Sequence, residues 1–274
     1  MAEASDTSTE SFRGLRIDWY GPEAAPGIVV LHGWGSSSAL MEGLALTLAH
    51  DFRVANVDLP GHGRAPVPEK ALGVPEQATL VADLIRERFA APVAVVGHSN
   101  GGRLGLFMAS GSEMKSLVSA LVLIAPSGVR PKRRPSYYLK KYTAQLLKAP
   151  FNLLPGRLRD FGLDWLRHSL VWKALGSSDY RRLDGVMRET FVKTVTHHLE
   201  DRLPSVTVPT LIFWGDRDRD ISRDQIAVLE SRIPDAGVVT LKGAGHYAHL
   251  DDPQTVQLAA AHFLRETLGV SSAT

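Results

Sequence analysis

Residues 92–109 read PVAVVGHSNGGRLGLFMA, and this stretch decides the fold. Its first six residues form an apolar, β-branched run that is typical of a buried strand, and residues 101–109 are typical of a helix. Between them lies the pattern G-x-S-x-G, which puts Ser99 on a sharp strand-to-helix turn. Glycines on both sides leave room for the crowded backbone, so that the Ser99 hydroxyl projects out of the sheet. A glycine-rich turn needed only for packing is the alternative, but the strand, the helix and the additional Gly102 favour a nucleophile.

Apolar strands and helical patterns alternate on both sides of this stretch. Strands are predicted at 27–31, 52–57, 117–125, 210–214 and 236–241, and helices at 38–50, 75–89, 222–232 and 253–268. Residues 12–20 alternate in part and predict one early strand, while residues 1–10 are expected to be a loose tail. Continuous apolar strands alternating with helices predict a mostly parallel sheet with helices on both faces.

Residues 130–205 interrupt this alternation, because they contain helical stretches but no clear strand. We expect a helical cap inserted into a core made of residues 1–129 and 206–274. The inserted segment has 16 Lys and Arg residues against 7 Asp and Glu residues, whereas the rest of the chain has 15 against 22. A basic cap on an acidic body is the simplest explanation. Attraction of an anionic substrate and weak binding to an anionic membrane surface are the alternatives.

Composition excludes several classes of protein. A chain of 274 residues fits one α/β domain with a modest insertion, and the absence of cysteine excludes disulfides, thiolate metal sites and cysteine nucleophiles. No apolar run is long enough to span a bilayer, and the polar N-terminus lacks a signal pattern. We therefore expect a soluble cytoplasmic protein. The basic run at 130–134 has no aromatic platform beside it, so a nucleic-acid partner is not expected.

The loop after the strand at 27–31 reads His-Gly-Trp-Gly, residues 32–35. A tetrahedral intermediate needs two hydrogen-bond donors aimed at its negatively charged oxygen. We expect these to be the main-chain N–H of Asn100, directly after the nucleophile, and that of Trp34 in this loop. His32 is expected to shape the loop.

A serine nucleophile needs a base to accept its proton, and the chain has ten histidines. His246 directly follows a glycine in the loop after the last predicted strand, so it is the preferred base. His249 is its main rival. His98 is expected to be structural, and His197 and His198 to lie at the surface of the insertion.

An acid must orient this base, and the strand at 210–214 is followed by three candidates. They are Asp216, Asp218 and Asp220. Spacing from the strand end favours Asp218, although the residues alone leave a three-way choice. The loop after Ala125 reads Pro-Ser-Gly and offers no acid.

Five short motifs occur in order along the chain: H-G-x-G at 32–35, D-x-P-G-x-G at 58–63, G-x-S-x-G-G at 97–102, W-G-x-x-D at 214–218 and G-x-G-H at 243–246. In this the chain resembles the α/β-hydrolase superfamily, and more closely its capped esterase and C–C hydrolase branch. The resemblance implies the α/β-hydrolase fold, a cap over the site, Asp218 as the triad acid and no cofactor; no metal is expected. Serine at position 99 disfavours dehalogenases and epoxide hydrolases, which use aspartate there.

These residues predict a serine hydrolase that cleaves a small to medium, apolar carboxylic ester through an acyl-enzyme. The same triad would also serve a C–C hydrolase of vinylogous diketones, a lactonase or a thioesterase. A ligand-binding receptor on the same fold is the non-enzymatic alternative. Trp34, Tyr137, Tyr138 and Trp165 are expected to line the substrate pocket, unless the aromatic residues of the insertion serve only to pack it onto the core.

Overall fold

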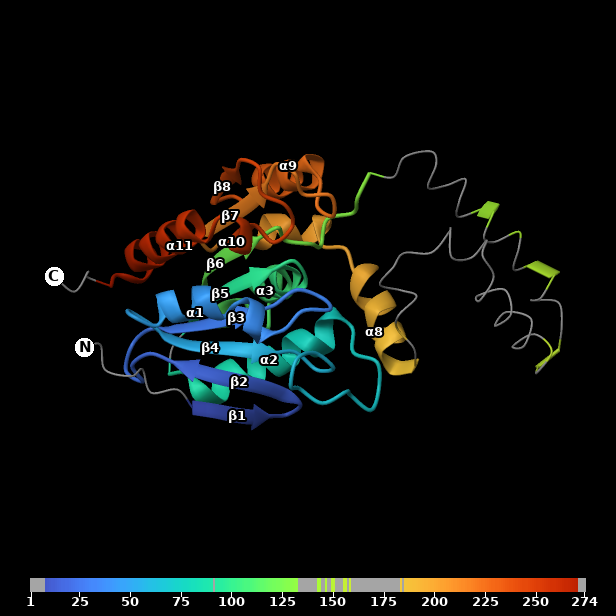
Figure 1. Ribbon diagram of the computed structural model, residues 1–274, viewed down its shortest axis with the longest axis horizontal. Helices are drawn as coiled ribbons and strands as arrows, with labels where there is room; N and C mark the ends of the chain where they lie inside the picture. Colours follow the sequence, from blue (N-terminus) through green and yellow to red (C-terminus); the bar gives the residue numbers. More distant parts are fainter. Residues whose placement is uncertain are drawn as a thin grey trace.

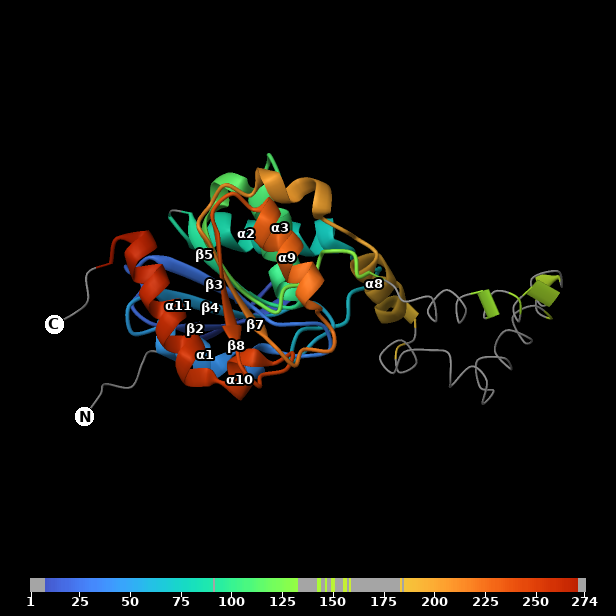
Figure 2. The same ribbon diagram turned by 90° about the horizontal axis from the view of Figure 1, so that it is seen from above.

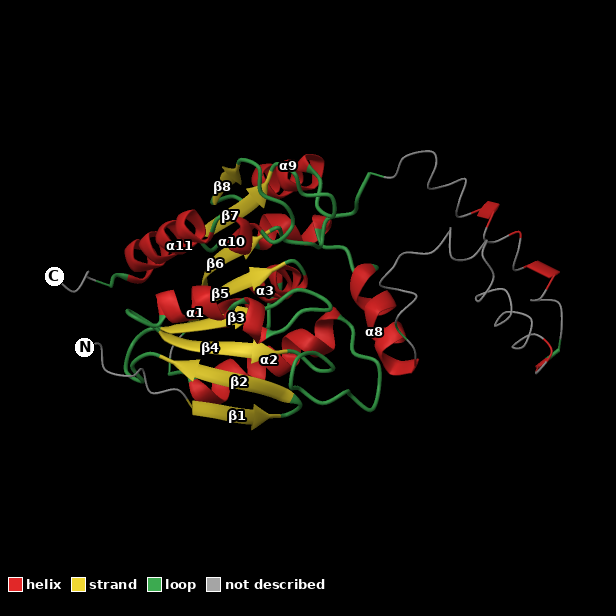
Figure 3. Ribbon diagram, in the orientation of Figure 1, coloured by secondary structure: helices red, strands yellow, loops and turns green. Residues whose placement is uncertain are grey.

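One eight-stranded sheet forms the centre of the molecule (Figures 1 and 3). The computed structural model describes residues 8–90, 92–132, 142–143, 146, 149–150, 155–156, 158, 183 and 185–270. In spatial order the strands are β1 (Ser8–Phe12), β2 (Leu15–Tyr20), β4 (Arg53–Asp58), β3 (Gly27–Leu31), β5 (Val93–His98), β6 (Val118–Ile124), β7 (Thr210–Gly215) and β8 (Ala236–Leu241). β2 pairs antiparallel with β1 and β4, and every other pair is parallel. The prediction of a mostly parallel sheet is confirmed.

Helices cover both faces of this sheet (Figure 2). On one face lie α2 (Val74–Arg88), α3 (Asn100–Ser110) and α9 (Arg223–Arg232), and on the other lie α1 (Glu42–Leu48), α10 (Ala248–Asp251) and α11 (Pro253–Leu268). Strand β5 shows why its sequence is a continuous apolar run. Val93 and Val95 face the first helical layer, whereas Ala94 and Val96 face the second. Both faces of a central parallel strand are buried, so both sets of side chains are apolar.

The N-terminal edge of the sheet differs from the expectation. The single strand predicted over 12–20 is wrong, because Arg13 and Gly14 divide it into the antiparallel hairpin β1–β2. Their φ angles are 48° and 88°, and two consecutive residues with positive φ form a tight hairpin turn. The loose tail expected over residues 1–10 is also wrong for residues 8–10, which belong to β1.

Within residues 130–205 the structure describes α8 (Gly185–Val195) and a 3-10 helix (Glu200–Ser205). Two buried threonines one turn apart attach α8 to the start of α2. Thr190 Oγ1 accepts a hydrogen bond from Leu72 N at 3.1 Å, and Thr194 Oγ1 accepts one from Gln77 Nε2 at 3.0 Å. The division into core and cap stays a prediction. None of the described helices combines the length and apolar composition required to cross a bilayer.

The parallel strands bring four loops to one edge of the sheet. These are the loops that follow the carboxyl ends of β3, β5, β7 and β8, and they contain the motifs at 32–35, 97–102, 214–218 and 243–246. Ligand sites of open α/β sheets lie outside the carboxyl ends of the strands.

Candidate active site

Ser99 has a backbone conformation that residues other than glycine rarely adopt, with φ 48° and ψ −103°. Neighbouring main chain holds it there: Ser99 N donates to Ile124 O at 2.9 Å, and Ser99 O accepts from Arg103 N at 3.1 Å. The flanking glycines are required sterically. A Cβ on Gly97 would lie 2.4 Å from the carbonyl carbon of Gly101, and a Cβ on Gly101 would lie 2.2 Å from Leu31 O. Strained backbone that its surroundings maintain is typical of a functional position.

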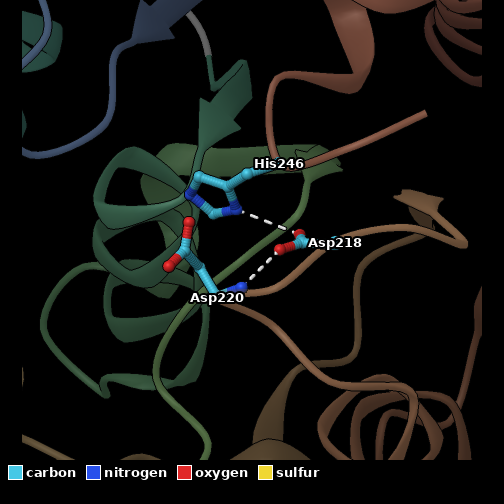
Figure 4. Close-up of side chains that lie close together, drawn as sticks. All are labelled: Asp218, Asp220 and His246. Atoms are coloured by element: carbon cyan, nitrogen blue, oxygen red, sulfur yellow. Dashed lines mark hydrogen bonds and ion pairs between the residues drawn. The ribbon is translucent and has the colours of Figure 1, made fainter.

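His246 and Asp218 form a hydrogen-bonded pair (Figure 4). His246 Nδ1 lies 3.0 Å from Asp218 Oδ2, and the Asp218 side chain has no exposed surface. The second carboxylate oxygen of Asp218 accepts from Asp220 N at 2.8 Å and from Ile221 N at 3.0 Å. Because the carboxylate is held by its own loop, it orients the imidazole with Nδ1 as the donor and Nε2 free to accept a proton.

The other two acids of this loop have different partners. Asp216 Oδ1 accepts from Gly243 N at 2.7 Å and thereby braces the loop that carries His246. The carboxylate of Asp220 points toward the imidazole ring (Figure 4). Asp218, Asp220 and His246 each offer a ligand atom, and these atoms lie within 4.8 Å of one another, a spacing compatible with a metal ion. Asp218, however, already uses both oxygens in hydrogen bonds.

The remaining histidines near the site are buried and stay neutral. His98 Nε2 lies 3.0 Å from His246 O, so His98 supports the loop that carries His246. Burial lowers the pKa of His98, and it lowers the pKa of His249 to about 4. His249, the rival base, lies in α10 and is not among the residues that line the cavity at Ser99. The surface position expected for His197 and His198 is only partly observed, because both are half-buried.

Ser99 and His246 line one cavity of about 250 Å³. Ser99 and His246 share this cavity, but no hydrogen bond joins Ser99 Oγ to any residue that the structure describes. Loops of the core and helix α8 contribute the other lining residues: Trp34, His98, Asn100, Arg103, Ser127, Phe191, Thr194, Val195, Asp220 and Tyr247.

The two expected oxyanion donors both belong to this cavity. Neither Trp34 N nor Asn100 N donates a hydrogen bond to any described residue, so both N–H groups are available to a ligand. His32 shapes the loop, as expected: its Nδ1 lies 2.7 Å from Gly33 O, and its Nε2 accepts from Leu59 N at 3.0 Å. Burial lowers the pKa of His32 to about 4, which keeps it neutral for this pair of contacts.

Several lining residues were not predicted from the sequence, among them Arg103, Thr194 and Tyr247. Thr194 and Tyr247 carry no pattern that could have revealed them. Arg103 had a signal, because it follows Ser99 by four residues at the start of a helix and therefore lies on the same side of that helix. Of the other expected pocket residues, Trp34 contacts Phe191 of α8 at a ring-centroid distance of 5.1 Å. Tyr137, Tyr138 and Trp165 lie outside the described residues.

Two curated relatives and one solved structure show what this chain is similar to. It is 30% identical to the pimeloyl-(acyl-carrier protein) methyl ester esterase of Chromobacterium violaceum, over 87% of this chain and 94% of the relative. It is 27% identical to the 2-(acetamidomethylene)succinate hydrolase of Mesorhizobium japonicum, over 96% and 99% of the two chains. The 2-hydroxy-6-oxo-6-phenylhexa-2,4-dienoate hydrolase from Rhodococcus sp. strain RHA1 shares the fold, with a TM-score of 0.68, 20% identity and coverage of 97% and 100%.

A family model also matches most of the chain. The model described as the alpha/beta hydrolase family matches residues 28–257, from the start of β3 into α11. This range includes the four loops at the carboxyl edge of the sheet and the cavity between them. The resemblance and the fold inferred from the sequence are confirmed: the chain belongs to the alpha/beta hydrolase family, and it is a hydrolase.

Proposed function

We propose that this hydrolase is a serine esterase that cleaves small to medium carboxylic esters with Ser99, His246 and Asp218. One observation carries the proposal: the 3.0 Å hydrogen bond from His246 Nδ1 to the buried Asp218, on the cavity that also contains the strained Ser99. In a catalytic triad the carboxylate accepts a hydrogen bond from the imidazole, and the imidazole accepts the proton of the serine.

In the proposed reaction, Ser99 Oγ attacks the ester carbonyl while His246 Nε2 accepts its proton. Asp218 stabilises the imidazolium that forms, because it faces Nδ1 and is itself fixed by two main-chain N–H groups. The imidazolium then protonates the leaving alcohol, and an acyl group remains on Ser99. Water, deprotonated by His246, releases the acid and restores the serine.

The negatively charged oxygen of each tetrahedral intermediate is assigned to the main-chain N–H groups of Trp34 and Asn100. Both groups lack other acceptors among the described residues. Asn100 also begins α3, so the partial positive charge of a helix N-terminus adds to its effect. Removing one donor of such a pair costs about 10²- to 10³-fold in kcat in a well-studied serine protease.

The size of the cavity supports a small to medium substrate. Its volume of about 250 Å³ lies just below the range of roughly 300–1,000 Å³ that is usual for ligand pockets. We assign residues 130–205 as a cap over this cavity, since Phe191, Thr194 and Val195 of α8 line it. Similarity to a relative named as a methyl ester esterase favours an ester over the other bonds that this triad would cleave. Cytoplasmic location stays a prediction.

Hydrolysis of p-nitrophenyl esters with acyl chains from C2 to C12 tests this function. Wild type, Ser99→Ala and Ser110→Ala are compared, because Ser110 ends the same helix but does not line the cavity. We expect wild type and Ser110→Ala to hydrolyse the short members, and Ser99→Ala to lose activity by at least about 10³-fold. A fluorophosphonate probe should label wild type and Ser110→Ala but not Ser99→Ala.

Each part of the proposal has its own contrary outcome. Full activity of Ser99→Ala would refute the nucleophile. Labelling of Ser99 without hydrolysis of any ester would leave a reactive serine and refute the ester substrate, and assays with a dienone and with lactones would then identify the bond. No labelling and no hydrolysis would favour a receptor on this fold.

A further inference from the structure

The cavity at Ser99 contains a buried cation, Arg103. Its side chain comes from α3, one turn after the nucleophile, and only 6% of the residue is exposed. One of its N–H groups has a partner, since Nη1 donates to the main-chain carbonyl of Thr194 in α8. Nε is buried and has no partner. Arg103 therefore keeps donors and a positive charge next to the reaction centre.

No described carboxylate neutralises this charge. Among the ion pairs between residues that the structure describes, none involves Arg103. Even Asp220, which lines the same cavity, forms no ion pair with it. Burial alone lowers the pKa of Arg103, to about 10, so the guanidinium is still a cation at neutral pH. An unpaired charge in a protein interior is costly, and buried charges are normally paired. The missing partner is thus expected to arrive with the ligand.

We propose that Arg103 binds a carboxylate of the substrate, so that the enzyme acts on esters that also carry a free carboxylate. This inference rests on the proposed function, and it specifies the substrate class of the same site. The planar guanidinium matches a carboxylate and forms charge-assisted hydrogen bonds with it. Arg103 and Ser99 line the same cavity of about 250 Å³, so one small substrate can place its carboxylate at Arg103 and its ester carbonyl at Ser99. The carboxylate belongs to the acyl part or to the alcohol part of the ester.

Attachment of α8 is the structural alternative for Arg103. The bond to Thr194 O lies in the last turn of α8, where a cation stabilises the helix end. A carbonyl accepts one hydrogen bond without neutralising the charge, and the same helix is also attached through Thr190 and Thr194 side chains. The two roles predict different kinetics, because attachment of α8 affects every substrate equally, whereas a carboxylate partner affects only anionic ones.

The test compares esters that differ in one carboxylate. Ethyl hydrogen glutarate is paired with ethyl pentanoate, and 4-acetoxybutanoate with butyl acetate, which puts the carboxylate on the acyl side or on the alcohol side. Hydrolysis is followed by titration of the released acid for wild type, Arg103→Met and Arg103→Lys. Arg86→Met is the control, because Arg86 lies in α2, is exposed and does not line the cavity.

We expect wild type and Arg86→Met to favour the anionic member of at least one pair by about tenfold or more in kcat/KM. Arg103→Met should reduce that preference by about 10- to 100-fold, the usual effect of removing a hydrogen bond to a charged group, and mainly through KM. Arg103→Lys should retain part of it. Equal kcat/KM for both members of both pairs in wild type would overturn the inference. So would an equal loss on both members in Arg103→Met.

A binding measurement separates this inference from the esterase proposal. Ser99→Ala and Ser99→Ala/Arg103→Lys are titrated with ethyl hydrogen glutarate, 4-acetoxybutanoate and their neutral counterparts by calorimetry, which needs no turnover. Tighter binding of an anionic ester that weakens in the double variant supports the carboxylate site even if wild type hydrolyses nothing. Equal affinity for anionic and neutral esters refutes it even if wild type is an active esterase.

Discussion

Replacing Gly101 by alanine adds one methyl group where α3 meets the end of β3. The new Cβ would lie 2.2 Å from Leu31 O and 2.6 Å from its carbonyl carbon, both main-chain atoms. Real Cβ atoms almost never approach another atom within 3.0 Å, so helix and strand must separate by about 0.8 Å. The movement would break the hydrogen bond from Gly101 N to His32 O, now 3.1 Å, and displace Ser99 from the loop at 32–35.

The expected cost follows from two opposing terms. Overpacking costs roughly 1–3 kcal/mol, while alanine in place of a helical glycine contributes about 1 kcal/mol to stability. The net destabilisation is then at most about 2 kcal/mol, which corresponds to a fall in Tm of up to roughly 8 °C for a chain of this size. A shift of nearly 1 Å between Ser99 and the proposed oxyanion donors should lower kcat by about 10²-fold. Activity should thus fall far more than stability.

Gly105→Ala is the matched control in the same helix. Its Cβ would meet side-chain atoms of Leu121 and Val95, both at 3.2 Å, and these can adjust without moving the main chain. We expect Tm and kcat close to wild type. Thermal unfolding and ester hydrolysis are measured for wild type and both variants. If Gly101→Ala matched Gly105→Ala in kcat, the argument from close approach of α3 and β3 would be wrong.

Three further predictions concern the carboxylate that faces His246, the stability of the protein at acidic pH and the size of the pocket. Asp218→Asn should lower kcat on the order of 10³-fold by removing the acceptor for His246 Nδ1, whereas Asp216→Asn should change it less than about tenfold; kcat equal in the two variants would contradict this. Because burial lowers the pKa of His249 from 6.5 to about 4, the unfolded chain gains a proton that the folded protein excludes, and the free energy of unfolding should fall by up to about 3 kcal/mol between pH 6.5 and pH 4. Urea unfolding at several pH values in this range should show that the free energy of unfolding falls less steeply with decreasing pH in His249→Asn than in wild type. An equal pH dependence in the two proteins would refute the assignment to His249. Trp34→Ala keeps the main-chain N–H but enlarges the cavity, so the preferred p-nitrophenyl ester should be longer than in wild type; an unchanged preference would exclude Trp34 from the acyl pocket.

Local pattern determines a large part of this protein. Residues 92–109 predict strand, turn and helix because apolar periodicity and glycine placement are properties of the chain itself. The hairpin at residues 8–20 was missed for the opposite reason. Arg13 and Gly14 carry no strong turn signal as a pair, and the turn forms because the two strands pair across it.

The candidate site was also predicted in part from the sequence and in part left open. Strand ends predicted which loops carry Ser99, His246 and the three aspartates, since parallel strands bring their carboxyl ends to one edge. Spacing alone left the choice of acid open. Among the described residues, the direction of each side chain distinguishes Asp218, which bonds to His246, from Asp216, which bonds to Gly243.

By itself the sequence determined the sheet, the elbow at Ser99 and the order of the five motifs, because these depend on local periodicity and on a few glycines. Only the tertiary structure decided that Arg103 is buried on the cavity of Ser99 and forms no ion pair with any described acidic residue. Burial and charge pairing depend on residues far apart in the chain. Helix α8 accepts one of the arginine's hydrogen bonds across about 90 residues of sequence, and no described carboxylate forms an ion pair with it. A spacing of four residues from the nucleophile could indicate where Arg103 lies, but not that its charge is left for a ligand.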